Sequence, residues 1–106
     1  MSYCVSKAAV AQLTKCAALE LAPKGVRVNA VNPGVITSTR MAQNAGLPEE
    51  FYKRVAEQSK TAHPIGRAGT PQEVAKAIAF LASDDHAAFI TGITLSIDGG
   101  RAVACP

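Results

Sequence analysis

The chain has 106 residues, a length typical of one small domain, and its 48% hydrophobic and 18% charged residues exclude a disordered tail. Eleven basic residues outweigh eight acidic ones, giving a net charge of +3, but no aromatic residue interleaves a basic cluster, so we expect no nucleic-acid binding. The apolar runs are far shorter than the roughly 20 residues that a membrane helix needs, so we expect no membrane association.

The cysteines and histidines show no metal-binding pattern. Cys4, Cys16 and Cys105 are an odd number of cysteines without ligand spacing, which is typical of reduced thiols in an intracellular, cytoplasmic protein. His63 and His86 are far apart and lack carboxylate or thiol partners at ligand spacing. We therefore expect no metal site and interpret both histidines as loop residues without a catalytic role.

The first half of the chain predicts a helix followed by a strand. Good helix formers fill residues 2–22, with Ser2 as a candidate cap and with Pro23 and Gly25 as stop signals. Residues 26–32 read V-R-V-N-A-V-N, an alternation of β-branched residues that favours a strand ending at Pro33-Gly34.

The second half predicts two helices and a second strand. A helix is expected from Pro48 to about residue 62, and a loop over 63–69. Thr70, Pro71 and Glu73 form a capping box with proline at its preferred first position, which opens a helix that ends at residues 83–85. Residues 90–97 alternate as a strand, residues 98–100 form a turn, and the remaining residues carry no firm signal.

The order helix, strand, helix, helix, strand predicts an α/β protein with parallel strands joined through helices. Two strands are fewer than a stable sheet needs, and parallel strands are normally flanked by others. We therefore expect these elements to be part of a larger sheet.

Several short motifs follow one another along the chain. They are Tyr3-x-x-x-Lys7, V-N-A-V-N-P-G-V-I at 28–36, T-P-Q-E-V-A from Thr70, F-L-A-S from Phe80, I-T-G from Ile90 and I-D-G-G from Ile97. In this order and spacing the set resembles the short-chain dehydrogenases/reductases, especially the members similar to 3-oxoacyl-carrier-protein reductases. The resemblance implies that residues 1–106 form the C-terminal half of a Rossmann-like doubly wound parallel sheet, without its N-terminal dinucleotide-binding half.

Tyr3 and Lys7 are the candidate catalytic residues. Positions i and i+4 lie on one face of a helix, so both side chains reach a common site. Interconversion of a carbonyl and a secondary alcohol needs a group that gives or takes a proton, and a free tyrosine has a pKa near ~10. A neighbouring ammonium favours the phenolate, so we expect Lys7 to lower the pKa of Tyr3. The alternative is an ordinary surface pair on a helix.

The resemblance also implies an NAD(P)(H) site, with the choice between NAD and NADP left open. Lys7 would bind the nicotinamide ribose, and the backbone near Ile36 would hold the carboxamide. Pro33 and Gly34 end the strand at the sheet edge where α/β proteins bind ligands. Ser38 stands where the family usually has an assisting threonine. The family's glycine-rich phosphate loop has no match in these residues.

The partners expected from the resemblance are a small carbonyl or alcohol substrate of open identity and, in the full-length form, further copies in a homodimer or homotetramer. We expect the isolated chain to be inactive, because the phosphate loop lies outside it. The alternative is a truncated, non-catalytic interaction module that pairs with full-length subunits through helix 2–22.

Overall fold

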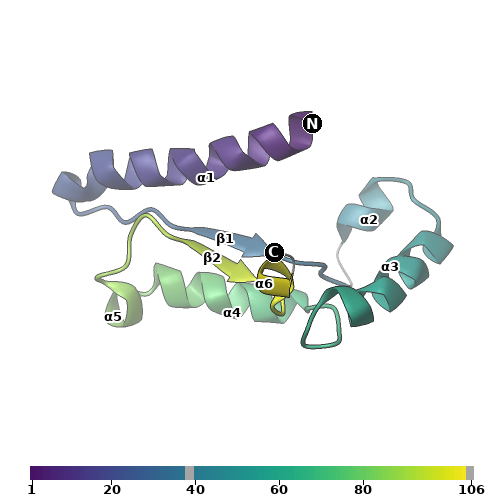
Figure 1. The fold of residues 1–106 in the computed structure, drawn as a ribbon. Helices are drawn as coiled ribbons and strands as arrows, with labels where there is room; N and C mark the ends of the chain where they lie inside the picture. Colours follow the sequence, from purple (N-terminus) through teal and green to yellow (C-terminus); the bar gives the residue numbers. More distant parts are fainter. Residues whose placement is uncertain (38–39, 105–106) are drawn as a thin grey trace. The chain divides into compact units, whose positions relative to one another are not determined.

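A computed structural model describes residues 1–37 and 40–104 (Figure 1). The predicted α/β class is confirmed, with helices and two strands alternating along the chain. The elements are α1 (Ser2–Leu21), η1 (Ala22–Lys24), β1 (Ala30–Pro33), α2 (Arg40–Asn44), α3 (Glu49–Ala62), α4 (Pro71–Ala82), α5 (Asp84–Ala87), β2 (Thr94–Ile97) and α6 (Arg101–Ala104).

The strands β1 and β2 pair directly in a two-stranded sheet. The Ala30 N–H donates to the Ile93 carbonyl (2.9 Å) and the Gly34 N–H donates to the Ile97 carbonyl (3.0 Å). Donor and acceptor advance by the same number of residues along both strands, which is the register of a parallel pair. The parallel connection predicted from the element order is therefore present.

The chain divides into two compact units, residues 1–31 with 78–95 and residues 32–77 with 96–106. In the first unit, α1 and the C-terminal end of α4 lie on opposite sides of the strand segments (Figure 1). Ala18 of α1 is 3% exposed, and a side chain added at Gly92 would lie 3.4 Å from its Cβ. Small residues on both sides thus allow α1 to approach the segment that leads into β2.

The start and end of the first helix differ in detail from the prediction. Ser2 lies inside α1, and the capping position is occupied by Met1, which makes no side-chain cap. α1 ends at Leu21, just before Pro23, and the chain continues as the short helix η1. Pro23 occupies an early position of η1, where a missing N–H costs nothing. Gly25 ends the helical segment with φ +72°, a conformation that glycine adopts without strain.

Both strands are shorter than their sequence patterns predict. The prediction of strand over 26–29 and 90–93 was wrong, since β1 begins at Ala30 and β2 at Thr94. Side-chain bonds join the two segments there, beside one backbone bond from the Gly92 N–H to the Val28 carbonyl (2.7 Å). The Val28 N–H donates to the Thr91 hydroxyl (3.0 Å). The Asn29 side chain donates to the Ile90 carbonyl and accepts from the Ile93 N–H. These side-chain bonds, between residues far apart in the chain, interrupt the regular ladder.

The large apolar side chains of α1 lie on its exposed face: Val5, Val10, Leu13 and Leu19. The buried positions of the helix are instead Thr14, whose hydroxyl donates to the Val10 carbonyl (3.0 Å), and Ala18. Exposed apolar side chains favour association with another chain.

In the second unit the predicted helix boundaries are largely confirmed. α3 begins one residue after Pro48 and carries Glu49 and Glu50 in its first turn, where the helix dipole favours acidic groups. α2 and α6 were not predicted. α6 follows the 98–100 turn because the Asp98 carboxylate accepts hydrogen bonds from the N–H groups of Gly100 (3.1 Å) and Ala102 (2.9 Å).

Within residues 1–37 and 40–104, no helix is both long enough and apolar enough to cross a membrane.

Candidate active site

Tyr3 and Lys7 lie one turn apart on the first two turns of α1. The ammonium nitrogen of Lys7 is 5.6 Å from the centroid of the Tyr3 ring, within the range of a cation–π contact. The Tyr3 side chain is open to solvent, with 70% of the residue exposed. The helix therefore presents a phenol and an ammonium together on an accessible surface, as the spacing predicts.

Pro33, Gly34 and Ile36 lie at the carboxyl end of β1, in the second unit. Ile36 forms an isolated parallel bridge with Gly69. The Gly69 N–H donates to the Val35 carbonyl (2.9 Å), and the Thr37 N–H donates to the Gly69 carbonyl (3.0 Å). In a parallel bridge made this way, the bridged residue turns its own N–H and C=O away from its partner. The backbone groups of Ile36 thus point to the side opposite Gly69.

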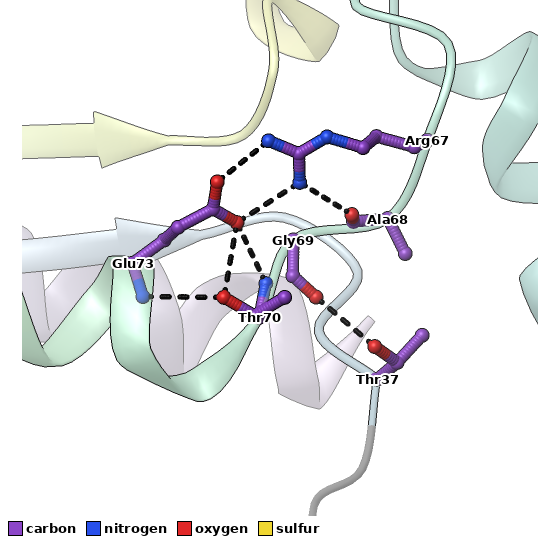
Figure 2. A network of polar contacts seen from close by, with 6 residues as sticks. All are labelled: Thr37, Arg67, Ala68, Gly69, Thr70 and Glu73. Atoms are coloured by element: carbon purple, nitrogen blue, oxygen red, sulfur yellow. Dashed lines mark hydrogen bonds and ion pairs between the residues drawn. The ribbon is translucent and has the colours of Figure 1, made fainter.

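The segment around Gly69 is held by a polar network (Figure 2). The Thr37 hydroxyl donates to the Gly69 carbonyl (3.3 Å). Next to it, the Thr70 N–H donates to the Glu73 carboxylate (2.9 Å), and the Glu73 N–H donates to the Thr70 hydroxyl (3.3 Å). These reciprocal bonds confirm the predicted capping box, and they fix the loop that pairs with Ile36.

An ion pair completes this network. The Arg67 guanidinium makes two contacts with the Glu73 carboxylate (2.6 and 3.0 Å) and also donates to the Ala68 carbonyl (3.0 Å), as Figure 2 shows. The hydrogen bond from Arg67, together with that from the Thr70 N–H, lowers the pKa of Glu73 to about 2. The same pair raises the pKa of Arg67. Both groups are therefore charged throughout the physiological range.

His63 lies in the loop after α3, as predicted, and it is buried beside the segment that contains Ile36. It follows the last turn of α3 and is 2% exposed. Its Nε2 accepts a hydrogen bond from the Val35 N–H (3.3 Å), directly before Ile36. His63, Arg67 and Glu73 all contribute to the lining of one cleft of about 280 Å³. The sequence carries no signal for this, since His63 lies far from Val35 along the chain.

The other sequence-predicted positions have mixed outcomes. Ser38 lies outside the described residues, as does Cys105. His86 is not a loop residue, because it lies in α5, where its Nδ1 is 2.9 Å from the Ser83 hydroxyl. Among the described residues, no group of three or more His, Cys, Asp or Glu side chains is placed to hold a metal ion.

Comparison with known proteins identifies the family. Residues 1–102 match the family model described as Enoyl-(Acyl carrier protein) reductase. The chain is 44% identical over 99 residues to 2-(S)-hydroxypropyl-CoM dehydrogenase 3 of Xanthobacter autotrophicus, covering 93% of this chain and 38% of that protein. It is 48% identical over 97 residues to cyclohexanol dehydrogenase of an Acinetobacter species, covering 92% and 34%.

Solved structures agree with these matches. A short-chain dehydrogenase/reductase of unknown function from Caenorhabditis elegans, crystallised with cofactor, superimposes with a TM-score of 0.87 at 34% identity, over 95% of this chain and 38% of that one. The chain therefore belongs to the short-chain dehydrogenase/reductase family, a family of oxidoreductases. It spans 34% to 42% of the length of the curated relatives that it matches.

Proposed function

We propose that the protein carrying this chain is an NAD(P)(H)-dependent oxidoreductase that interconverts a carbonyl and a secondary alcohol. The observation that carries the proposal is the Tyr3–Lys7 pair, presented on an exposed helix face in a member of a family of oxidoreductases. A phenol is a proton donor when a carbonyl is reduced, and its phenolate is a base when an alcohol is oxidised.

In this mechanism Tyr3 holds the proton that passes to or from the substrate oxygen. Lys7 places a positive charge one helical turn away, which stabilises the phenolate when it forms. Lys7 also has donors to spare for the hydroxyls of a nicotinamide ribose, because an ammonium carries three N–H groups. A bound nicotinamide supplies or accepts the hydride.

The segment at the end of β1 fits the carboxamide of such a cofactor. A carboxamide needs one donor and one acceptor close together, and the N–H and C=O of Ile36 both face away from Gly69. Pro33 and Gly34 bring the chain to this edge, where α/β proteins bind ligands. Ser38 follows two residues later and is proposed as an assisting hydroxyl. The choice between NAD and NADP stays open.

Residues 1–106 are proposed to be the C-terminal half of the family's doubly wound sheet, with the dinucleotide phosphates bound by the other half. The order of the motifs from Tyr3 to Ile97 supports this placement. The isolated chain is accordingly proposed to be inactive. The full-length form is proposed to be a cytoplasmic homodimer or homotetramer.

The substrate class is proposed to be a small secondary alcohol or the corresponding ketone. Two matched relatives are named for such alcohols, hydroxypropyl-CoM and cyclohexanol. Members similar to 3-oxoacyl-carrier-protein reductases act on such a ketone, at carbon 3 of an acyl thioester. The shared chemistry is a hydride added to or removed from one carbon while Tyr3 handles the proton on its oxygen.

A chimeric dehydrogenase tests the proposal. The matched segment of the Acinetobacter cyclohexanol dehydrogenase is replaced by the matched residues of this chain, and oxidation of cyclohexanol is followed by formation of reduced nicotinamide. We expect the chimera to retain cofactor binding and measurable activity. A folded chimera that binds neither NAD nor NADP would contradict the proposed site.

The second candidate function is a non-catalytic module that pairs with full-length subunits. The exposed apolar face of α1, with Val5, Val10, Leu13 and Leu19, favours it. Under this function the 106-residue chain co-purifies with a full-length relative and binds no cofactor, and Leu13→Asp together with Val10→Asp abolishes the pairing.

A further inference from the structure

The imidazole of His63 is enclosed by two glycines. A Cβ at Gly34 would lie 2.8 Å from Nε2 of the ring, and a Cβ at Gly99 would lie 3.3 Å from the Cβ of His63. The residue is 2% exposed. Neither flanking position has room for a side chain, so the ring is fixed between the end of β1 and the turn that follows β2.

Both ring nitrogens of His63 have partners, and the partners determine where the proton lies. The Val35 N–H is only a donor, so Nε2 (3.3 Å away) must be the unprotonated acceptor. The carbonyl of Ser59 is only an acceptor, so Nδ1 (2.9 Å away) carries the hydrogen. The two contacts are satisfied together by one species, the neutral imidazole protonated at Nδ1.

The two hydrogen bonds of the His63 ring differ in whether the partner group would keep another hydrogen bond if the ring were removed. The Ser59 carbonyl also accepts from the backbone N–H of His63 (3.1 Å), so it keeps a partner without the ring. The Val35 N–H donates its hydrogen bond to the ring nitrogen Nε2. Removal of that nitrogen leaves a part-buried backbone donor unsatisfied, which is the more costly loss.

Val35 is thereby held on both sides, through its N–H by His63 and through its carbonyl by the Gly69 N–H (2.9 Å). The next residue along the chain is Ile36. Since a peptide unit is planar, the orientation of the Val35 carbonyl fixes the orientation of the Ile36 N–H. The ring of His63 thus fixes, through Val35, the orientation of the Ile36 N–H, which faces away from Gly69.

We propose that His63, as the neutral imidazole protonated at Nδ1, is a positioning residue for the nicotinamide carboxamide at Ile36. The proposal rests on the function proposed above, which assigns that ligand to this segment. His63 touches neither substrate nor cofactor in this role. It fixes the Val35–Ile36 peptide before the ligand arrives, so that ordering this peptide adds no cost on binding.

Two matched variants of the full 106-residue chain separate the two ring nitrogens. His63→Gln places an amide oxygen near the position of Nε2 and keeps an acceptor for the Val35 N–H. His63→Asn reaches only to the position of Nδ1 and removes that acceptor. Both replace the ring by an amide, so a general loss of packing affects them alike.

Nuclear magnetic resonance measures the nitrogen shifts of the His63 ring in the wild-type chain. In the wild-type chain and both variants it also measures the amide exchange of Val35 and the response of the Ile36 amide to nicotinamide mononucleotide. The wild-type ring is expected to show the Nδ1–H tautomer. In His63→Asn we expect Val35 exchange to rise by about fivefold or more, the effect of one hydrogen bond, and mononucleotide affinity to fall by about the same factor. His63→Gln is expected to restore most of both. The internal control is the Ala87 amide, which donates to the Ser83 carbonyl (2.8 Å) in the other unit.

Several outcomes overturn the proposal. They are a wild-type chain whose Val35 amide is unprotected, equal Val35 exchange in His63→Asn and wild type, and a faster Val35 exchange without any loss of mononucleotide affinity. If the Ile36 amide signal of the wild-type chain does not change when the mononucleotide is added, the result contradicts the proposed cofactor site instead. In that case Val35 exchange still decides whether His63 fixes the segment.

Discussion

Replacement of Gly34 by alanine is the sharpest test of how the segment at the end of β1 is packed. The added Cβ would lie 2.8 Å from Nε2 of His63 and 3.0 Å from the Cα of Asp98. Carbon contacts are most favourable at about 3.5–4.0 Å, so both approaches overlap. Gly99 restricts the same residue, because a Cβ there would lie 3.3 Å from the Cβ of His63 and 3.7 Å from its Cδ2.

Two effects of opposite sign set the magnitude. An overpacked site costs about 1–3 kcal/mol, and alanine at an unstrained glycine position stabilises by about 0.4–1 kcal/mol through the unfolded chain. Gly34 is not among the glycines with positive φ, so the stabilising effect applies to it in full. The two ranges differ by about 0–2.6 kcal/mol, and because two contacts overlap at once we expect a net destabilisation in the upper part, about 1–2.6 kcal/mol.

Urea denaturation followed by circular dichroism measures this change in the 106-residue chain. The control is Gly34→Ala in a His63→Ala background, where the ring is absent and only the contact with Asp98 remains. The penalty of Gly34→Ala should fall there by more than about 0.5 kcal/mol, the coupling expected of contacting residues. A Gly34→Ala chain that is as stable as wild type, or a penalty unchanged in the double variant, would refute the packing described here.

Three further predictions concern the capping box and the proposed catalytic residue Lys7. Thr70→Ala removes the hydroxyl that caps α4 and should destabilise the chain in urea by about 1 kcal/mol, with Thr70→Ser restoring most of the loss. Because the folded-state pKa of Glu73 is lowered from 4.5 to about 2, the stability that it contributes is complete above pH 4.5 and is lost as the pH falls toward 2. Urea midpoints across that range should therefore fall more steeply for wild type than for Glu73→Gln, and equal slopes would contradict the role of the pair with Arg67. In the chimeric dehydrogenase, Lys7→Met should lower kcat/KM by about tenfold or more at neutral pH, whereas the control Lys15→Met on the same helix should not; equal effects would contradict the assigned role of Lys7.

Features set by local chemistry could be predicted from the sequence. The α4 start is specified by Thr70, Pro71 and Glu73 alone, and the structure shows the reciprocal hydrogen bonds that this pattern implies. The Tyr3–Lys7 contact follows in the same way from helical spacing. Neither feature depends on residues that are distant in the chain.

Features set by distant partners could not be predicted. The alternation over 26–29 and 90–93 favours strands. In the structure, however, the Thr91 hydroxyl accepts from the Val28 N–H, and the Asn29 side chain accepts from the Ile93 N–H. Neither segment's sequence shows that the other will supply these side-chain bonds. The role of His63 likewise depends on Gly34, Val35 and Gly99, which come from other parts of the chain. A lone histidine in a loop-like sequence carries no sign of such partners.

The central claim is that Tyr3 transfers the proton in an oxidoreductase reaction. The measurement that tests it most directly is kcat/KM for alcohol oxidation by the chimeric dehydrogenase with Tyr3→Phe, compared with Lys15→Met as a control on the same helix. We predict that Tyr3→Phe lowers kcat/KM by about 10²–10⁴-fold, the contribution of a general acid–base group, while cofactor affinity and the Lys15→Met variant change little. Full activity of Tyr3→Phe, or an equal loss in both variants, would contradict the assignment of Tyr3.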